Sequence, residues 1–252
     1  MKNNFKLKNN KLYIHPISDL HLGAKNCNLD FFEQWERVFY ETSGKNKLIY
    51  VLGDMIDLGS RHIGGFEQSL SGDEQINELI ELLEPYKKYI RVFAQGNHAA
   101  RAKKEFDLSL VHIIGRELGI PTTTNDYFDT IYINGQEFTI YCLHGTTYSK
   151  DKHLAIGAFN RQIQNIEYDL AMCGHNHLVE AWSNTRRTKE GIERKYQCFT
   201  GHFLKYKGSY ANDKMLNHIP EGFVRLNINK FCNVGYDFYN VDEINKKIEA
   251  SL

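Results

Sequence analysis

Hydrophobic and polar positions follow two different periods through the first two thirds of the chain. Short apolar runs typical of strands alternate with stripes spaced three and four residues apart, which are typical of amphipathic helices. The strand-like runs are residues 12–17, 47–52, 90–94, 127–133, 138–143 and 170–173, and the helical patterns are residues 31–40, 73–83, 106–118 and 154–166. Strand-like runs then follow at 179–182, 195–200, 223–228 and 236–241, before a helical tail from residue 242. This order predicts an α/β layered fold with mixed sheets.

Two local signals predict where particular elements begin and turn. Ser71 and Glu74 have the spacing of a capping box, in which each side chain accepts the other's backbone N–H, so we expect a helix to begin there. Asn134-Gly135 separates two strand-like runs, and both residue types tolerate the positive φ angles of a type I′ turn. The chain is therefore expected to form a β-hairpin at this point.

The composition is that of an ordinary globular protein. Of the 252 residues, 42% are hydrophobic and 25% are charged, which excludes disorder as the main state. No linker or repeat interrupts the sequence, so we expect a single domain over residues 1–252. The longest apolar stretches are far shorter than the roughly 18 to 20 residues of a membrane span, so no membrane partner is expected. Residues 1–11 are polar and unlike a secretory signal, which predicts a cytoplasmic protein.

Charge and cysteine content narrow the function classes further. The chain has 31 Lys and Arg against 31 Asp and Glu, so its formal net charge is zero. Such a protein does not coat nucleic acid through bulk electrostatics, although local basic clusters can still guide a polyanion. The five cysteines are widely spaced and include no C-x-x-C pair, which favours reduced thiols over a disulfide framework or a thiolate zinc site.

Metal-ligating side chains follow the predicted strands at the point where each strand ends, which is where an α/β architecture places its sites. Their number suits two ions about 3.5 to 4 Å apart that share a bridging carboxylate. Because cysteine is absent from the set, a structural zinc site is disfavoured, and manganese, iron or zinc remain candidates. The donors are Asp19, His21, Asp54, Asn97, His144, His175 and His177.

The motifs that contain these donors resemble those of the calcineurin-like metallophosphoesterase superfamily. Its ordered pattern is D-x-H, G-D-x-x-D, G-N-H-[E/D], H and G-H-x-H. All five blocks occur in this order between Asp19 and His177. One block alone is weak evidence, whereas five in order make the chain similar to this superfamily.

The resemblance implies a layered α/β/β/α sandwich with two mixed β-sheets and a metal site at the C-terminal ends of the strands. It also implies that a hydroxide bridging the two ions attacks phosphorus, while the metals offset charge on the phosphoryl oxygens. His98 would protonate the leaving oxygen or stabilise the transition state, and Asp57 would orient ligands. One ion would be held by Asp19, His21, Asp54 and His177, and Asp54 would bridge to a second ion completed by Asn97, His144 and His175.

One position departs from the superfamily pattern. The residue after the G-N-H histidine is usually an acid that orients this histidine, and here it is Ala99. The general-acid role of His98 therefore requires a carboxylate from elsewhere, for which Asp126, Asp151 or another carboxylate is a candidate. Arg101 lies three residues beyond His98 and is expected to form a bidentate phosphate contact.

The remaining histidines and lysines are weaker candidates. His62 and His202 are secondary candidates for lining the site, whereas His15 lies inside a predicted strand and favours a core or surface position. Lys205 and Lys207 are expected on a solvated face unless they border the cleft.

These patterns lead to three hypotheses. The first is a phosphodiesterase that uses two divalent ions, most suitably manganese, and acts on nucleic acid (DNA or RNA) or nucleotide substrates. The second is a phosphomonoesterase or protein phosphatase, and the third is a catalytically weak metal-binding scaffold, which Ala99 favours. Segments near residues 101, 119–121 and 201–211 resemble small phage and bacterial phosphoesterases, some of them DNA-repair exonuclease-like.

Overall fold

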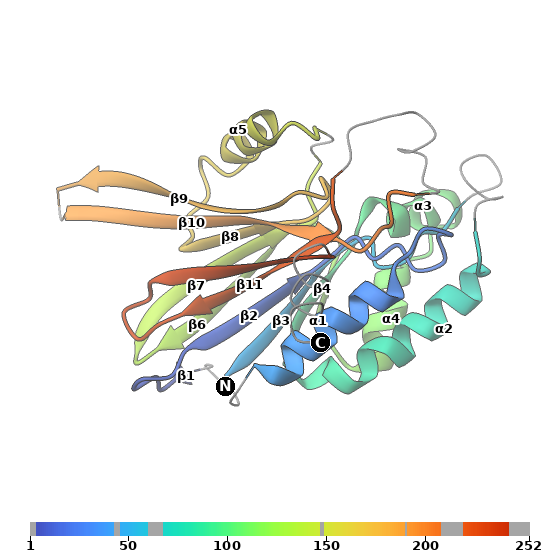
Figure 1. The fold of residues 1–252 in the computed structure, drawn as a ribbon, viewed down its shortest axis with the longest axis horizontal. Helices are drawn as coiled ribbons and strands as arrows, with labels where there is room; N and C mark the ends of the chain where they lie inside the picture. The colour runs from blue at the N-terminus through green and yellow to red at the C-terminus, as the bar shows by residue number, and fades with distance from the viewer. Residues whose placement is uncertain are drawn as a thin grey trace, which may run out of the picture.

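A computed structural model describes residues 4–42, 46–59, 68–146, 149–189, 191–207 and 219–241. In this part of the chain a curled mixed sheet is covered by helices on its outer faces (Figure 1). The strands are β1 (Asn4–Phe5), β2 (Leu12–Ile17), β3 (Lys47–Leu52), β4 (Ile90–Ala94), β5 (Thr122–Thr123), β6 (Tyr127–Ile133), β7 (Gln136–Leu143), β8 (Leu170–Cys173), β9 (Val179–Thr188), β10 (Gly191–His202), β11 (Gly222–Ile228) and β12 (Val234–Asn240).

The helices begin where side chains satisfy their first backbone N–H groups. Asn28 caps the first helix by accepting the Phe31 N–H, and Ser71 and Glu74 form the predicted capping box of the second. The helices are α1 (Leu29–Glu41), α2 (Gly72–Leu83), α3 (Asn97–Phe106), α4 (Leu110–Leu118) and α5 (Lys152–Gln162), with a 3₁₀ helix, η2 (Glu84–Tyr89).

The sheet has two halves that are joined through one strand. Its order is β1-β6-β7-β8-β10-β11-β2-β3-β4-β5, with β9 paired to β10 and β12 paired to β11. β10 pairs with β8 over Tyr196–Phe199 and then with β11 at Gly201 and His202. Gly201 has a φ of +89°, and a Cβ there would lie 1.9 Å from the Gly222 carbonyl oxygen, so only glycine fits this crossing. The two predicted sheets are therefore continuous with each other.

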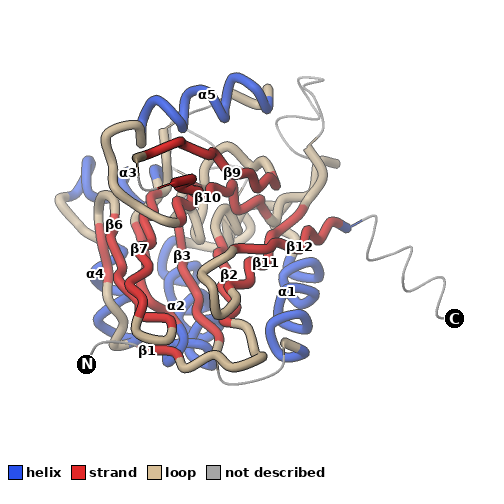
Figure 2. The backbone as a smooth tube through the Cα atoms, turned by 90° about the vertical axis from the view of Figure 1, so that its left-hand side faces the viewer, coloured by secondary structure: helices blue, strands red, loops and turns tan. Residues whose placement is uncertain are grey.

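Three hydrophobic clusters define the layers (Figure 2). One lies between the two halves of the sheet and includes Ile14, Tyr50 and Ile140. A second packs α1, α2 and α4 against the outer face of the half that contains β2, β3 and β4. The third packs α5 against the outer face of β7 and β8. This arrangement confirms the layered α/β fold with helices on both outer faces.

Parallel strands bring the carboxyl ends of five strands to the same region. β2, β3 and β4 are parallel neighbours in one half, and β7 and β8 are parallel in the other. Because the carboxyl ends of parallel strands meet at one edge of a sheet, the loops after these strands lie together.

Most predicted elements are confirmed, and several differ in their bounds. Residues 106–118 were expected to form one helix, but α3 ends at Phe106 and α4 begins at Leu110. The pattern missed α3 because Ala99 is its only buried residue, so it has no apolar stripe. β9 and β10 extend beyond their predicted bounds, through polar residues that alternation does not detect.

Asn134 and Gly135 both have positive φ, as the predicted type I′ turn requires. The helical tail from residue 242 lies outside the described residues. No helix in the described part of the chain has the length and apolar content of a membrane span. The single domain over residues 1–252 and the cytoplasmic location stay predictions.

Candidate metal centre

Backbone strain occurs in the loops after β2, β3 and β8. Positive φ angles between 46° and 72° occur at five of the predicted donors, which are Asp19, His21, Asp54, His175 and His177. Such a conformation costs a non-glycine residue about 1–3 kcal/mol and persists only where the surroundings impose it. Backbone hydrogen bonds between neighbouring loops do so here, from Asp19 N to Gly53 O (3.1 Å) and from His21 N to Asp54 O (3.0 Å).

The first group of donors consists of Asp19, His21 and His177, whose ligand atoms all lie within 4.8 Å of one another. Asp19 Oδ1 is 3.8 Å from His21 Nε2 and 3.4 Å from His177 Nε2. The other oxygen of Asp19, Oδ2, accepts the His175 backbone N–H (2.8 Å) and the Ser18 hydroxyl. The second oxygen is therefore fixed, and the first points at the two imidazoles.

The second group consists of Asp54, His144 and His175, which also lie within 4.8 Å of one another. His144 Nε2 is 3.0 Å from Asp54 Oδ2 and 3.2 Å from His175 Nδ1. The Asn97 side-chain oxygen lies 3.0 Å from the same His144 nitrogen. Four of the predicted donors therefore meet here.

Hydrogen bonds orient the members of the second group. His144 Nδ1 lies 2.7 Å from the Leu52 carbonyl oxygen, to which it donates, so Nε2 is left as the atom facing Asp54. Asp54 Oδ1 accepts the His98 backbone N–H (2.8 Å) at the first turn of α3, where a helix favours negative charge.

Asp57 links the first group to His98. Its Oδ1 lies 2.9 Å from His21 Nδ1 and 3.1 Å from His98 Nδ1. Its Oδ2 accepts from the Gln68 amide (2.5 Å), and its backbone N–H donates to the Gln75 side chain (3.2 Å). Asp57 is thus the carboxylate beside His98.

Two of the carboxylates considered for the role of the acid missing at Ala99 have other partners in the structure. Asp126 accepts a hydrogen bond from the Tyr141 hydroxyl (2.9 Å), and Asp151 caps α5 through the Leu154 N–H (2.9 Å). The sequence did not show that Asp57 lies beside His98. The two residues belong to different motif blocks, and the distance between them depends on how β3 and β4 pair.

Arg101 contacts the same corner of the site. Its Nη1 donates to the carbonyl oxygens of Asp57 (3.4 Å) and Leu58 (3.3 Å), and its Nη2 lies 3.2 Å from His98 Nε2. Because arginine only donates, His98 Nε2 accepts in this arrangement, and Nδ1 carries its proton toward Asp57.

The electrostatics of the first group are dominated by carboxylates. Burial alone would lower the pKa of His21, but the neighbouring carboxylates of Asp19 and Asp57, the second in hydrogen-bond contact with Nδ1, raise it to about 10. Burial opposes ionisation of Asp19, yet His177 and His21 hold its pKa well below the usual value. This side of the site therefore favours positive charge strongly.

In the second group the pKa values of the two histidines are shifted in opposite directions. Burial and the neighbouring His144 lower the pKa of His175 to about 4, whereas Asp54 outweighs burial and raises the pKa of His144. A neutral His175 has a lone pair available for a metal ion.

Two observations show that the residues present fit divalent cations. Asp19 Oδ1 and His21 Nε2 are buried and accept or donate no hydrogen bond among the described residues, although buried polar atoms normally find such partners. A Cβ at Gly96 would lie 2.0 Å from Asp54 Oδ1, so glycine leaves this carboxylate accessible. Mixed carboxylate, imidazole and amide donors suit first-row divalent ions.

Other residues near the site were weak or absent candidates in the sequence. His202 stacks against His177 with ring centroids 4.9 Å apart, which places this secondary candidate beside the first group. Thr200 supports Ser18 through a hydroxyl contact of 2.6 Å, and no sequence signal identifies it. His62 lies outside the described residues, and Lys205 pairs with the exposed Asp30 (3.6 Å).

Comparison with known proteins gives a family match and distant structural similarities. The family model of the calcineurin-like phosphoesterases matches residues 14–206. A metallophosphoesterase from Sphaerobacter thermophilus is 16% identical, with a TM-score of 0.47 and coverage of 96% of this chain and 95% of that chain. A predicted phosphoesterase from Streptococcus pneumoniae TIGR4 is 16% identical, with a TM-score of 0.45 and coverage of 93% and 92%. Vacuolar Protein Sorting 29 from Cryptosporidium parvum is 16% identical, with a TM-score of 0.46 and coverage of 91% and 98%. A sequence search of curated proteins finds no match.

Proposed function

Because the chain belongs to the calcineurin-like phosphoesterase family, we propose that it is a two-metal phosphodiesterase that acts on nucleic acid or nucleotide substrates. The family itself implies metal-dependent hydrolysis of phosphoesters. The observation that carries the finer proposal is the meeting of the two donor groups, with two unpartnered polar atoms facing each other in the first.

The proposed ligands divide between the two groups. Asp19, His21 and His177 would hold one ion, Asn97, His144 and His175 would hold the other, and Asp54 would serve both. Bound divalent ions would make a water molecule acidic enough to act as a nucleophile and would offset negative charge on the phosphoryl oxygens. We propose manganese as the ion, with iron or zinc as alternatives, since the donor set contains no thiolate.

The residues around His98 would handle the leaving group. Asp57 would hold the His98 ring through Nδ1, so that Nε2 faces the substrate. Arg101 occupies Nε2 in this structure, and a substrate phosphate would compete for its guanidinium. Once the guanidinium turns to the phosphate, Nε2 would be free to take up a proton from solvent and to donate it to the leaving oxygen.

A substrate panel with added Mn²⁺ tests the proposal. We expect hydrolysis of bis-p-nitrophenyl phosphate and of single-stranded oligonucleotides to exceed hydrolysis of p-nitrophenyl phosphate. A large preference for the monoester would favour a phosphomonoesterase or protein phosphatase instead. Full metal loading without turnover of any of these esters would favour a catalytically weak scaffold.

A further inference from the structure

The β9–β10 hairpin extends beyond the rest of the sheet (Figure 1). Its residues pair continuously from Val179 and Thr200 at the base to Thr188 and Gly191 near the tip. β8 supports β10 only over Tyr196–Phe199, so the outer part of the hairpin has no third strand. At a rise of about 3.3 Å per residue, the tip lies roughly 30 Å from the base, which adjoins the candidate metal centre.

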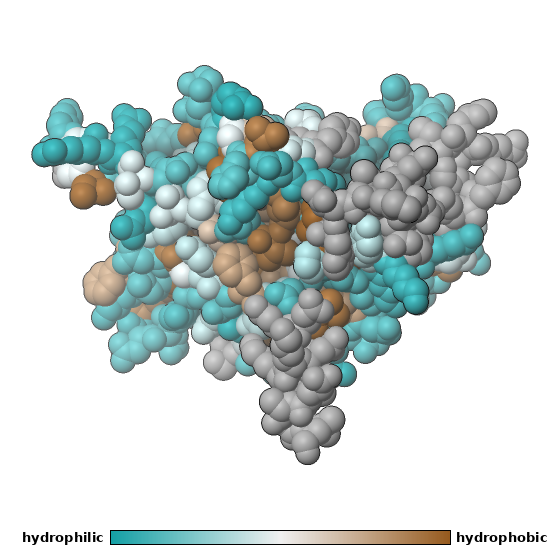
Figure 3. All heavy atoms as spheres, turned by 45° about the horizontal axis from the view of Figure 1, so that its top comes forward, coloured by the Kyte–Doolittle hydropathy of each residue, from teal (hydrophilic) through white to brown (hydrophobic). Residues whose placement is uncertain are grey.

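The outer part of the hairpin carries excess positive charge on a chain of zero net charge. The two described carboxylates of the hairpin contact lysines, Glu180 near the base with Lys152 (2.5 Å) and Glu193 in the outer part with Lys195 (2.7 Å). Four further basic residues lie near the tip, Arg186, Arg187, Lys189 and Arg194. Hydrophilic residues cover most of this projecting end (Figure 3).

The strand register divides these cations between the two faces of the hairpin. Arg186 lies opposite Glu193, whereas Arg187 lies opposite Ile192 and Arg194 lies opposite Thr185. Because side chains alternate along a strand, Arg187 and Arg194 share one face with Ile192 and Thr185. We call these four residues the arm face.

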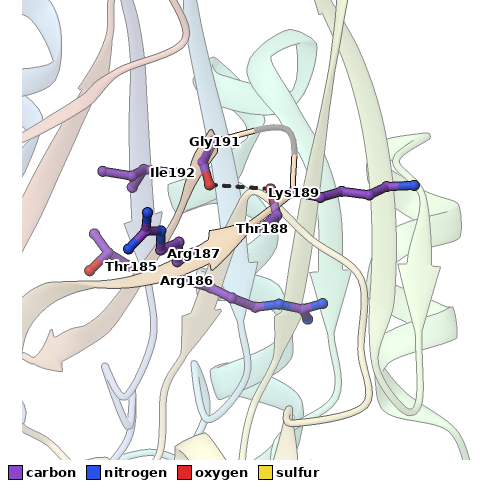
Figure 4. A pocket seen from close by; sticks show the side chains of 7 residues that line it. All are labelled: Thr185, Arg186, Arg187, Thr188, Lys189, Gly191 and Ile192. Atoms are coloured by element: carbon purple, nitrogen blue, oxygen red, sulfur yellow. Dashed lines mark hydrogen bonds between the residues drawn. The ribbon is translucent and has the colours of Figure 1, made fainter.

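The arm face has two arginines that make no ion pair among the described residues, and Ile192 between them is 78% exposed. In Figure 4, the side chains of Arg187, Ile192 and Thr185 lie on one side of the hairpin, and those of Arg186 and Lys189 extend to the other. A hollow of about 650 Å³ lies at the tip and is bordered by several of these residues.

Protection of the sheet edge explains only part of this arrangement. Cations on an edge strand discourage pairing with other chains, which accounts for charge on β9. It accounts equally for Arg194, because the outer part of β10 has a free edge among the described strands before Tyr196, where pairing with β8 begins. It does not account for Ile192, since an exposed isoleucine at a free hairpin tip favours association. Cations that flank an apolar side chain suit a ligand with both phosphates and apolar surface.

We propose that the arm face binds the backbone of a single-stranded nucleic acid that extends from the metal centre. This inference rests on the proposed function. Diagonal cross-strand neighbours lie about 7–8 Å apart, so Arg187 and Arg194 are placed to contact neighbouring phosphates along one strand. Ile192 then contacts an unstacked base, which a duplex keeps inside.

The distance between the metal centre and the arm face sets a minimum length for a strand that contacts both. A stacked strand advances about 3.4 Å per nucleotide, so the roughly 30 Å along the hairpin corresponds to about nine nucleotides. A longer strand reaches from the metal centre to the arm face, and a dinucleotide does not. The arm therefore strengthens binding of long strands and leaves small diesters unaffected.

Binding of a fluorescein-labelled 30-nucleotide oligothymidylate, followed by anisotropy at low salt, tests the arm. We expect R187E/R194E to weaken binding at least about tenfold. R187A/R194A should lower the slope of log K against log salt by about 1.4, since each phosphate contact on a single strand contributes about 0.7. The control R37E/R116E reverses two exposed arginines on α1 and α4, changes net charge equally and should alter affinity less than about twofold.

The outcomes separate the arm from the proposed function. The binding experiment is run with metal-loaded protein and with EDTA, so it needs no turnover, whereas hydrolysis of bis-p-nitrophenyl phosphate needs no arm. Equal loss of oligonucleotide binding in the arm and control variants overturns the arm face, as does the absence of binding by the unmodified protein. Aggregation of R187E/R194E with unchanged affinity would assign the arginines to edge protection alone.

Discussion

His15 and His21 are both buried, yet their surroundings have opposite effects on them. His15 lies on β2 in edge contacts with Trp35 and Phe39, is 0% exposed, and neither of its ring nitrogens has a hydrogen-bond partner in the part of the chain that the structure describes. Burial lowers its pKa to about 3, with Arg225 adding to the effect. His21, six residues later, is 5% exposed, and the carboxylates around it raise its pKa to about 10.

The comparison shows that carboxylates, and not the degree of burial, distinguish the site from the core. Removing an imidazolium from water is unfavourable in both places. The loops after β2 and β3 add Asp19 and Asp57 beside His21, and these reverse the balance. A region that retains a proton so strongly also attracts metal cations, which displace such protons when they bind.

The largest expected effect comes from removing Asp54, the carboxylate that we propose bridges the two metal ions. Asp54→Ala would leave two cations facing each other without a bridge, so we expect kcat/KM to fall by more than about 10⁴-fold, beyond the range of a single general acid. Activity on bis-p-nitrophenyl phosphate and the manganese content per chain measure this. Asp126→Ala, which loses only a contact with Tyr141, is the control. Near-normal activity of Asp54→Ala would rule out the bridge.

The next largest effect is expected at His98, and it separates a loss of catalysis from a loss of metal binding. His98→Ala should lower kcat by about 10²- to 10⁴-fold while leaving metal content unchanged, because a general acid is lost and no ligand is. The loss should shrink for nitrophenolate leaving groups, which need no proton. His112→Ala, an exposed change on α4, is the control. Equal losses for good and poor leaving groups would contradict the general-acid role.

The donors were predictable because each follows a predicted strand directly. A strand fixes the direction of the chain, and parallel neighbours bring the following residues together, so the motif order sufficed for Asp19, Asp54 and His175. The contact between Asp57 and His98 was not predictable, since it depends on the relative positions of two loops.

The fold was predictable where side chains reach a core. The apolar runs of β2 and β3 and the stripe of α4 mark residues that are buried. Among the described residues, the outer part of the β9–β10 hairpin contributes no side chain to the hydrophobic clusters, so its strands are held by backbone hydrogen bonds that leave no hydrophobic pattern.

A third prediction concerns His15 in the core and its effect on protein stability. The folded-state pKa of His15 is about 3 and its unfolded value is about 6.5, so protonation favours unfolding. Its contribution to stability is therefore intact above pH 6.5 and declines as pH falls toward 3. At pH 5 the loss is about 2 kcal/mol, at 1.36 kcal/mol per unit of pH below 6.5.

Urea unfolding of the wild type and of His15→Leu at pH 7 and pH 5 measures this loss. The variant has no proton to take up and should lose about 2 kcal/mol less than the wild type between the two pH values. His112→Leu, on the surface of α4, should behave as the wild type does. An unchanged pH dependence in His15→Leu would mean that the core tolerates the charged ring.

The smallest expected effect is that of substituting Arg101, which contacts His98 in the candidate metal centre. The guanidinium contacts His98 Nε2 and two carbonyl oxygens, so it either binds substrate or holds the histidine. If it binds a phosphate, Arg101→Ala should raise KM about tenfold, which is about 1.4 kcal/mol, for every diester with kcat nearly unchanged. If it holds His98, kcat should fall instead, and more steeply for poor leaving groups. Arg101→Lys is the informative control, because one ammonium keeps the charge but not the bidentate geometry. We expect Arg101→Ala to raise KM and Arg101→Lys to recover only part of the loss. An effect on kcat alone would mean that Arg101 positions His98 and does not bind substrate.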